Sequence, residues 1–85
     1  MQFMSLSIVT ASQFRAARNA LNWRITDAAK VSGVSIRTIK SIEAAEGLEA
    51  FKLSTIEKLK TAFEHHGIEF IGTPDDAPGI RIHKI

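Results

Sequence analysis

The chain has 85 residues, 45% of them hydrophobic, and a formal net charge of +2 at pH 7. Because it contains no cysteine, disulfides and thiolate metal sites are excluded as supports for its small core, which must depend on packing. It has no run of eighteen consecutive apolar residues, and residues 1–10 lack the pattern of a secretory signal. We therefore expect a single small domain that is cytoplasmic and makes no membrane contact.

Charge is distributed unevenly along the chain. Residues 1–42 contain six basic groups and one acidic group, for a net charge of +5. Residues 43–85 contain five basic and eight acidic groups, for a net charge of −3. This asymmetry is typical of a protein that presents one surface to a polyanion, although an ordinary solvated surface has the same composition.

A first helix is predicted from about Ala11 to Leu21. Thr10 and Gln13 form a capping-box pattern, in which each side chain bonds the backbone N–H of the other residue. Asn22 is a residue type that ends helices in the left-handed conformation. The apolar residues at helical spacing are Phe14, Ala16, Ala17, Ala20 and Leu21. The only tryptophan, Trp23, is expected as a core residue wedged between the first two helices.

Two short helical patterns follow and are separated by a glycine. The second helix is predicted over about Ile25 to Ser32, and Gly33 fits the corner after it because that corner requires positive φ. Ser35 is the expected N-cap of a third helix that ends near Ala45. The expected buried stripe of this helix is Val34, Ile39 and Ile42. The residues left on its outer face are Ile36, Arg37, Lys40 and Ser41.

A loop is predicted from Glu46 to Lys52, where the periodicity lapses around a glycine. Ser54 and Glu57 form a second capping-box pattern, which opens a fourth helix that Gly67 stops. The inward residues expected in this helix are Ile56, Leu59, Ala62 and Phe63.

The C-terminal tail changes to strand-like alternation. Strands are predicted at 68–71 and 80–83, around the turn-forming segment 72–79. A lone hairpin is barely stable, so these strands must pack on the helices or pair with a second chain. Residues 3–9 also alternate, which fits a further strand as well as a frayed or expression-derived arm. The single domain therefore divides into an arm (1–9), a helical bundle (10–66) and a β extension (67–85).

The segment from Ile25 to Glu43 has the spacing of a helix-turn-helix, whose second helix enters the major groove of DNA. With the helices around it, the chain resembles the lambda-repressor-like DNA-binding domains, the Cro/C1 or Xre-type family of small regulators. The likeness covers about Thr10 to Phe63, and the tail resembles a subgroup that ends in a small β extension. It implies a mainly α fold, a lambda-repressor-like helical bundle with a helix-turn-helix and a short C-terminal β-hairpin or dimerising strands.

The resemblance also implies roles for individual residues. Arg18 and Glu43 occupy the positions at which the family joins its first helix to the end of the recognition helix. The family's base-reading positions fall on Ile36, Arg37 and Ser41, with Thr38 and Lys40 nearer the phosphates. Arg37 is the expected main specificity residue, because arginine bonds guanine O6 and N7 together. The full set of expected DNA contacts is Arg24, Ser35, Ile36, Arg37, Thr38, Lys40 and Ser41.

The second helix departs from the family pattern. Ile25 stands where the family usually has a phosphate-binding glutamine, and Arg24 stands where it has a serine or threonine cap. Either Arg24 replaces the lost contact as a long-range charge, or Thr26 becomes the cap and the helix starts two residues later. Ala28 in place of the usual leucine thins the core there.

The remaining polar residues do not suggest catalysis. His65 and His66 are adjacent on a helix end, so they point about 100° apart and do not chelate one metal together. They are expected to interact with the helix dipole, His83 is isolated, and Asp75 and Asp76 belong to a turn. We expect no enzyme activity, no cofactor and no metal site.

The sequence thus favours a transcriptional regulator that binds double-stranded operator DNA as a homodimer. The alternative is a protein-interaction module, such as the antitoxin of a toxin-antitoxin pair, for which the acidic strand-forming tail is the cue. The two functions are not exclusive, because an antitoxin can also bind its own operator.

Overall fold

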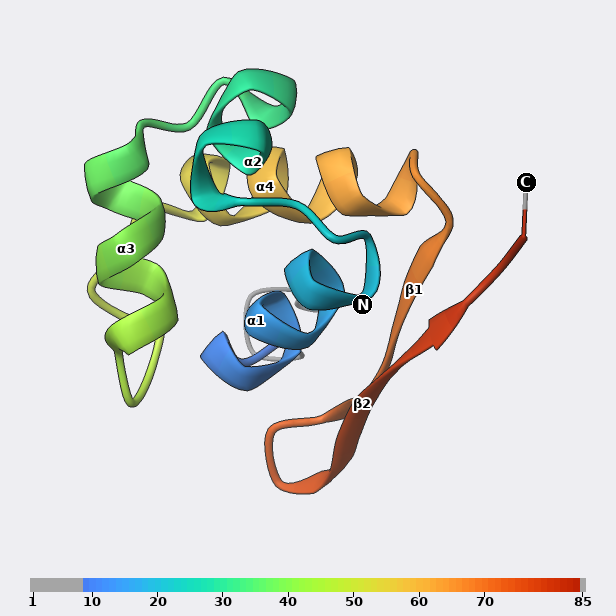
Figure 1. Ribbon diagram of the computed structural model, residues 1–85. Coiled ribbons are helices and arrows are strands. Elements are labelled where there is room, and N and C mark those ends of the chain that lie inside the picture. The colour runs from blue at the N-terminus through green and yellow to red at the C-terminus, as the bar shows by residue number, and fades with distance from the viewer. Residues whose placement is uncertain (1–8, 85) are drawn as a thin grey trace.

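The computed structural model describes residues 9–84, which form four helices followed by a two-stranded antiparallel sheet (Figure 1). The elements are α1 (Ala11–Ala20), α2 (Ile25–Ser32), α3 (Ile36–Ala44), α4 (Leu53–Glu64), β1 (Ile68–Thr73) and β2 (Asp76–Ile82). Helices make up about half of the chain, and each lies within two residues of its predicted position. The strand expected over residues 3–9 lies, apart from Val9, outside the described residues.

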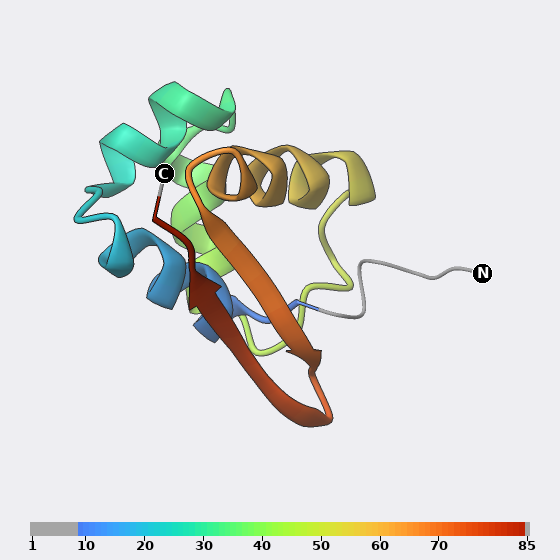
Figure 2. The ribbon, with the colours of Figure 1, turned by 90° about the vertical axis from the view of Figure 1, so that its right-hand side faces the viewer.

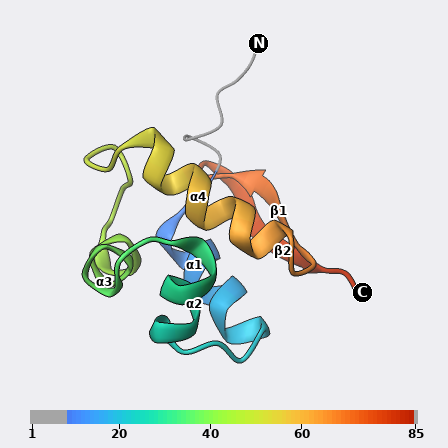
Figure 3. The ribbon, with the colours of Figure 1, turned by 90° about the horizontal axis from the view of Figure 1, so that it is seen from above.

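The elements are arranged in layers. Seen from above in Figure 3, the hairpin lies on one side of α1 and α4, and α3 lies on the other side. α1 contacts α3, α4 and β2, while α4 contacts α2 and β1. α1 therefore connects the hairpin physically to α3. Among residues 9–84, no helix has both the length and the apolar character needed to cross a membrane.

The ends of α1 are formed as its sequence predicts. Thr10 N–H donates to Gln13 Oε1 at 2.8 Å, and Gln13 N–H donates to Thr10 Oγ1 at 3.1 Å, so the capping box is confirmed. After the helix, Asn22 adopts φ 57°, the left-handed conformation expected of it. The predicted apolar stripe is narrower than expected, because Ala16 is exposed.

Aromatic rings from different elements meet in the core. Phe14 of α1 lies 6.1 Å from Phe63 of α4 and 5.5 Å from Phe70 of β1, measured between ring centroids. Trp23 is half-buried and stacks 5.4 Å from Phe63, with the His66 ring edge-on at 4.9 Å. We expected Trp23 to lie between the first two helices. Its ring contacts are instead with Phe63 and His66, at the C-terminal end of α4.

The start of α4 corrects a second expectation. The predicted capping box at Ser54 is wrong, because Ser54 lies inside the first turn and the N-cap is Lys52, without a side-chain capping bond. The preceding loop explains the shift: Leu48 is buried, Phe51 is half-buried, and Phe51 N–H donates to the Leu48 carbonyl at 3.1 Å. These contacts fix the chain ahead of Lys52. The inward residues of α4 are buried as predicted: Ile56, Leu59, Ala62 and Phe63.

The two strands pair with each other and pack on the helices (Figure 2). Ile68 is opposite Ile82 and Phe70 is opposite Ile80, and of these four Ile68 is fully buried. The strands extend further than predicted, so the turn is shorter than 72–79. Gly72 marks an irregularity in the ladder at φ 74°, where an added Cβ would lie 2.2 Å from the Ala77 carbonyl oxygen. This position requires glycine.

Gln13 has a second role that its capping pattern does not predict. Its buried amide Nε2 donates to the carbonyl oxygens of Ile71 at 3.0 Å and Gly79 at 2.8 Å, which face each other across the hairpin. The same side chain thus caps α1 through its oxygen and bonds both strands through its nitrogen. A buried donor shared in this way holds the hairpin against α1.

We predict that Gln13→Ala destabilises the fold by about 2 to 4 kcal/mol, because the bond from Thr10 N–H and both bonds to the strands are lost. Thr10→Ala is the control, since it removes only the other bond of the capping box, from Gln13 N–H to Thr10 Oγ1, and should cost about 1 kcal/mol. Urea unfolding followed by circular dichroism measures both losses. Equal losses in the two variants would show that the bonds to the strands contribute nothing.

Candidate nucleic-acid interface

α2 and α3 are joined by a three-residue connection, Gly33–Ser35. Gly33 ends α2 at φ 79°, and no atom lies within 4 Å of an added Cβ, so the requirement for glycine is conformational rather than steric. Val34 is buried beneath the corner. Ser35 caps α3 by accepting from Thr38 N–H at 3.1 Å. The local signals for this corner are confirmed.

α3 separates its residues between two faces. Ile39 and Ile42 are fully buried, and they fix the helix to the core. The four residues predicted on the outside are all exposed: Ile36, Arg37, Lys40 and Ser41. Ile36 is a large aliphatic side chain and is 40% exposed. The outer face of α3 therefore presents two cations, a hydroxyl and an apolar group together.

Ser35 and Thr38 form a small hydroxyl pair at the start of this face. Ser35 Oγ accepts from Thr38 N–H and donates to Thr38 Oγ1 at 2.9 Å. The Thr38 hydroxyl thus accepts within the pair, and its own hydrogen is left to donate outward.

The start of α2 excludes one of the two alternatives left open by its sequence. α2 begins at Ile25 with Arg24 as N-cap, so the shifted start with Thr26 as cap is wrong. Asp27 replaces the missing cap, because its carboxylate accepts from Arg24 N–H at 2.8 Å. The Arg24 side chain is 84% exposed and lies 3.6 Å from the same carboxylate. The backbone hydrogen bond from Arg24 and the neighbouring cations hold the pKa of Asp27 below its usual value.

Arg18 and Glu43 form a bidentate ion pair between α1 and the end of α3. Arg18 Nε lies 2.7 Å from Glu43 Oε2, and an Nη lies 3.0 Å from Oε1. The side chains are only 18% and 8% exposed, and Arg18 also donates to the Trp23 carbonyl at 3.1 Å. Hydrogen bonding to Glu43 raises the pKa of Arg18, so the guanidinium stays charged.

Arg15 is a further contact that sequence reasoning missed. Its guanidinium donates to the backbone carbonyl of Glu43 and, at 2.8 Å, to Ser12 Oγ. The last carbonyls of a helix carry partial negative charge, so a cation there is stabilising. Arg15 lies three residues before Arg18 on the same helix, and this spacing was the available signal. Of the six basic residues in 1–42, Arg15 and Arg18 therefore bind Glu43 at the end of α3 rather than an outside ligand.

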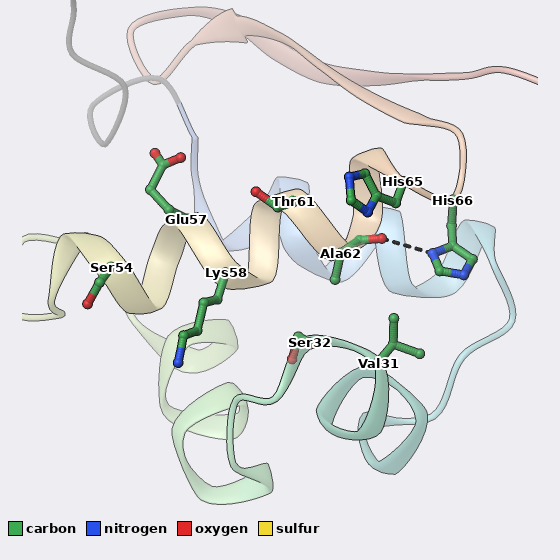
Figure 4. Close-up of a pocket in the computed structure, with 9 residues that line it drawn as sticks. All are labelled: Val31, Ser32, Ser54, Glu57, Lys58, Thr61, Ala62, His65 and His66. Atoms are coloured by element: carbon green, nitrogen blue, oxygen red, sulfur yellow. Dashed lines mark hydrogen bonds between the residues drawn. The ribbon is translucent and has the colours of Figure 1, made fainter.

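The histidines lie elsewhere. An open groove of about 490 Å³ runs between α2 and α4 (Figure 4), and His66 Nδ1 lies 3.0 Å from the Ala62 carbonyl at its end. His83 is not isolated as expected: its Nε2 lies 2.7 Å from Glu69 Oε1, and this hydrogen bond lowers the pKa of Glu69. In the described part of the chain, no three His, Cys, Asp or Glu residues are grouped as metal ligands would be.

No protein-family model matches this chain, and a search of curated proteins finds no match. The candidate site therefore depends on its own geometry and on the resemblance carried by its residues.

We predict that Arg18→Ala and Glu43→Ala each destabilise the fold by about 3 to 5 kcal/mol, because each leaves an unpaired charge in a mostly buried position. The double variant should lose much less than the sum of the two single variants. Urea unfolding of all four proteins completes the cycle. Additive losses would show that the two side chains do not interact.

We predict a pH dependence from Asp27. Its pKa is lower in the folded than in the unfolded chain, so its contribution to stability is complete above the unfolded pKa and is lost as pH falls through the folded value. Asp27→Asn should therefore have a Tm that falls less on acidification than that of the wild type. The control is Asp75→Asn, in the hairpin turn. Parallel curves for Asp27→Asn and the wild type would contradict this assignment.

Proposed function

We propose that this protein is a sequence-specific DNA-binding transcriptional regulator with a lambda-repressor-like helix-turn-helix fold. The observation that carries the proposal is the outer face of α3, where Arg37 and Lys40 are exposed while Ile39 and Ile42 are buried beneath them. A rigid helix with an apolar inner face and a cationic outer face has the shape and charge to enter the major groove.

The length of the connection supports this proposal. A three-residue corner between two helices is the spacing of a helix-turn-helix, in which the first helix crosses the DNA backbone and the second lies in the groove. The contacts of Arg15 and Arg18 with Glu43 fix the far end of α3. Recognition by hydrogen bonds requires such fixed geometry, because a mobile helix loses entropy when it binds.

Within this function each exposed residue has a distinct role. Arg37 donates to guanine O6 and N7, Ser41 bonds a neighbouring base edge, and Ile36 contacts a thymine methyl group. Lys40 and the free hydroxyl hydrogen of Thr38 meet phosphates, and Ser35 orients Thr38. Arg24 is exposed at the start of α2 and supplies charge to the backbone of the DNA. The regulator binds as a homodimer, with its two α3 helices about 34 Å apart in successive major grooves.

We predict that Arg37→Ala weakens operator binding by about 1 to 3 kcal/mol per half-site contact and relaxes the choice of base at one position of each half-site. Lys40→Ala should weaken binding to all sequences alike, because a phosphate contact carries no sequence information. Lys84→Ala, which removes the same charge beyond the end of β2, should leave binding unchanged. Selection from random DNA gives the operator, and fluorescence anisotropy gives the affinities.

Two outcomes would contradict the proposal. The first is an Arg37→Ala protein with unchanged sequence preference, which would remove Arg37 from base reading. The second is a wild-type chain that enriches no DNA sequence. If the chain then co-purifies with a stoichiometric protein, a protein-interaction module such as an antitoxin is the better description.

A further inference from the structure

Asp27 is the only acidic residue among residues 1–42, and it lies in the first turn of α2. Under the proposed function this end of α2 approaches DNA, because the first helix of a helix-turn-helix crosses the phosphate backbone. A negative charge at this position repels the phosphates that the surrounding basic residues attract. The contacts of Asp27 show which of those basic residues it affects.

The carboxylate of Asp27 is held in place by the backbone. Its Oδ2 atom accepts from Arg24 N–H at 2.8 Å, which closes the first turn of α2. This backbone hydrogen bond and the positive charges of Arg24 and Lys30 hold the pKa of Asp27 below its usual value. The group is therefore ionised at neutral pH, and it presents its charge at a fixed point of the helix.

The same oxygen atom lies next to the Arg24 side chain. Arg24 Nε is 3.6 Å from Asp27 Oδ2, and the rest of the arginine side chain is open to solvent. A guanidinium binds carboxylates and phosphates through the same N–H groups. The Asp27 carboxylate and a DNA phosphate are therefore alternative partners for Arg24.

The cations on α3 are arranged differently. Arg37 and Lys40 are both exposed, and the ion pairs formed within residues 9–84 do not include either of them. Competition between an acidic side chain and DNA is thus confined to the start of α2, away from the residues proposed to read bases.

We propose that Asp27 is an internal competitor for the phosphate contact of Arg24, so that it weakens the binding of this protein to DNA of any sequence. The inference rests on the proposed function, in which Arg24 faces the DNA backbone. A phosphate that approaches Arg24 must displace or share the carboxylate, and it also meets the negative charge of Asp27. Phosphates carry no sequence information, so Asp27 sets affinity without changing the choice of sequence.

The test compares three variants that separate the charge of Asp27 from its role as a cap. Asp27→Asn removes the charge and keeps a side-chain oxygen that can accept from Arg24 N–H. Asp27→Glu keeps the charge and a capping-box residue. Asp75→Asn removes the same charge in the hairpin turn. Fluorescence anisotropy of a labelled DNA duplex of random sequence measures each affinity, and circular dichroism checks that each variant folds.

We expect Asp27→Asn to bind about 5-fold more tightly than the wild type at about 50 mM salt. One recovered phosphate contact steepens the slope of log K against log salt by about 0.9, so this gain should shrink about 3.5-fold between about 50 and 200 mM salt. Asp27→Glu and Asp75→Asn should stay within about 2-fold of the wild type, because the first keeps the competitor and the second is remote from Arg24.

A double-mutant cycle tests whether Arg24 is the residue that Asp27 restrains. Arg24→Ala keeps the backbone N–H that the cap uses, so it removes only the guanidinium. Its effect on DNA affinity should be several-fold in the Asp27→Asn background and smaller than about 2-fold in the wild type.

The competition is overturned if Asp27→Asn and Asp75→Asn gain affinity equally, or if Arg24→Ala has the same effect in both backgrounds. Either result in a chain that selects an operator removes this inference and keeps the regulator. The expected cycle in a chain that selects no DNA sequence keeps this inference and contradicts the regulator. An absence of DNA binding by both the wild type and Asp27→Asn overturns both.

Discussion

The attachment of the α3 C-terminus to α1 is the contact on which the exposed face of α3 depends. Arg18 donates two hydrogen bonds to the Glu43 carboxylate, and Arg15 donates to the Glu43 backbone carbonyl. At the other end, Ser35 caps the helix and Gly33 sets the corner. α3 has only nine residues, too few for an isolated helix to persist in water, so these end contacts and its two buried isoleucines maintain it.

α1 serves both sides of the molecule. One of its faces directs Arg15 and Arg18 at α3, and Gln13 at its N-terminal end bonds both strands of the hairpin. α1, a helix of ten residues, thus contacts both the hairpin and α3 directly. The hairpin and α3 are each joined to α1 by hydrogen bonds, from Gln13 on one side and from Arg15 and Arg18 on the other. No flexible linker lies between these contacts.

The sequence predicted best those features that depend on neighbouring residues. The capping box of α1, the left-handed Gly33 and the Ser35 cap are local choices, and each appears as expected. The misses involve residues far apart in the chain: Gln13 with the strands, Arg15 with Glu43, and His83 with Glu69. The local pattern at Ser54 also failed: Leu48 and Phe51 pack on the core ahead of the helix, and α4 begins at Leu53. Local propensity gives way where tertiary contacts oppose it.

The separation of α3 into a buried face and an exposed face has a consequence for evolution. Ile36, Arg37 and Ser41 are exposed, whereas Ile39 and Ile42 carry the packing. Replacements at exposed positions usually change stability very little, so selection for folding places few restrictions on them. The two faces of the helix can therefore change independently. A lineage of such chains can change the exposed side chains of α3, one residue at a time, while every intermediate remains a folded protein.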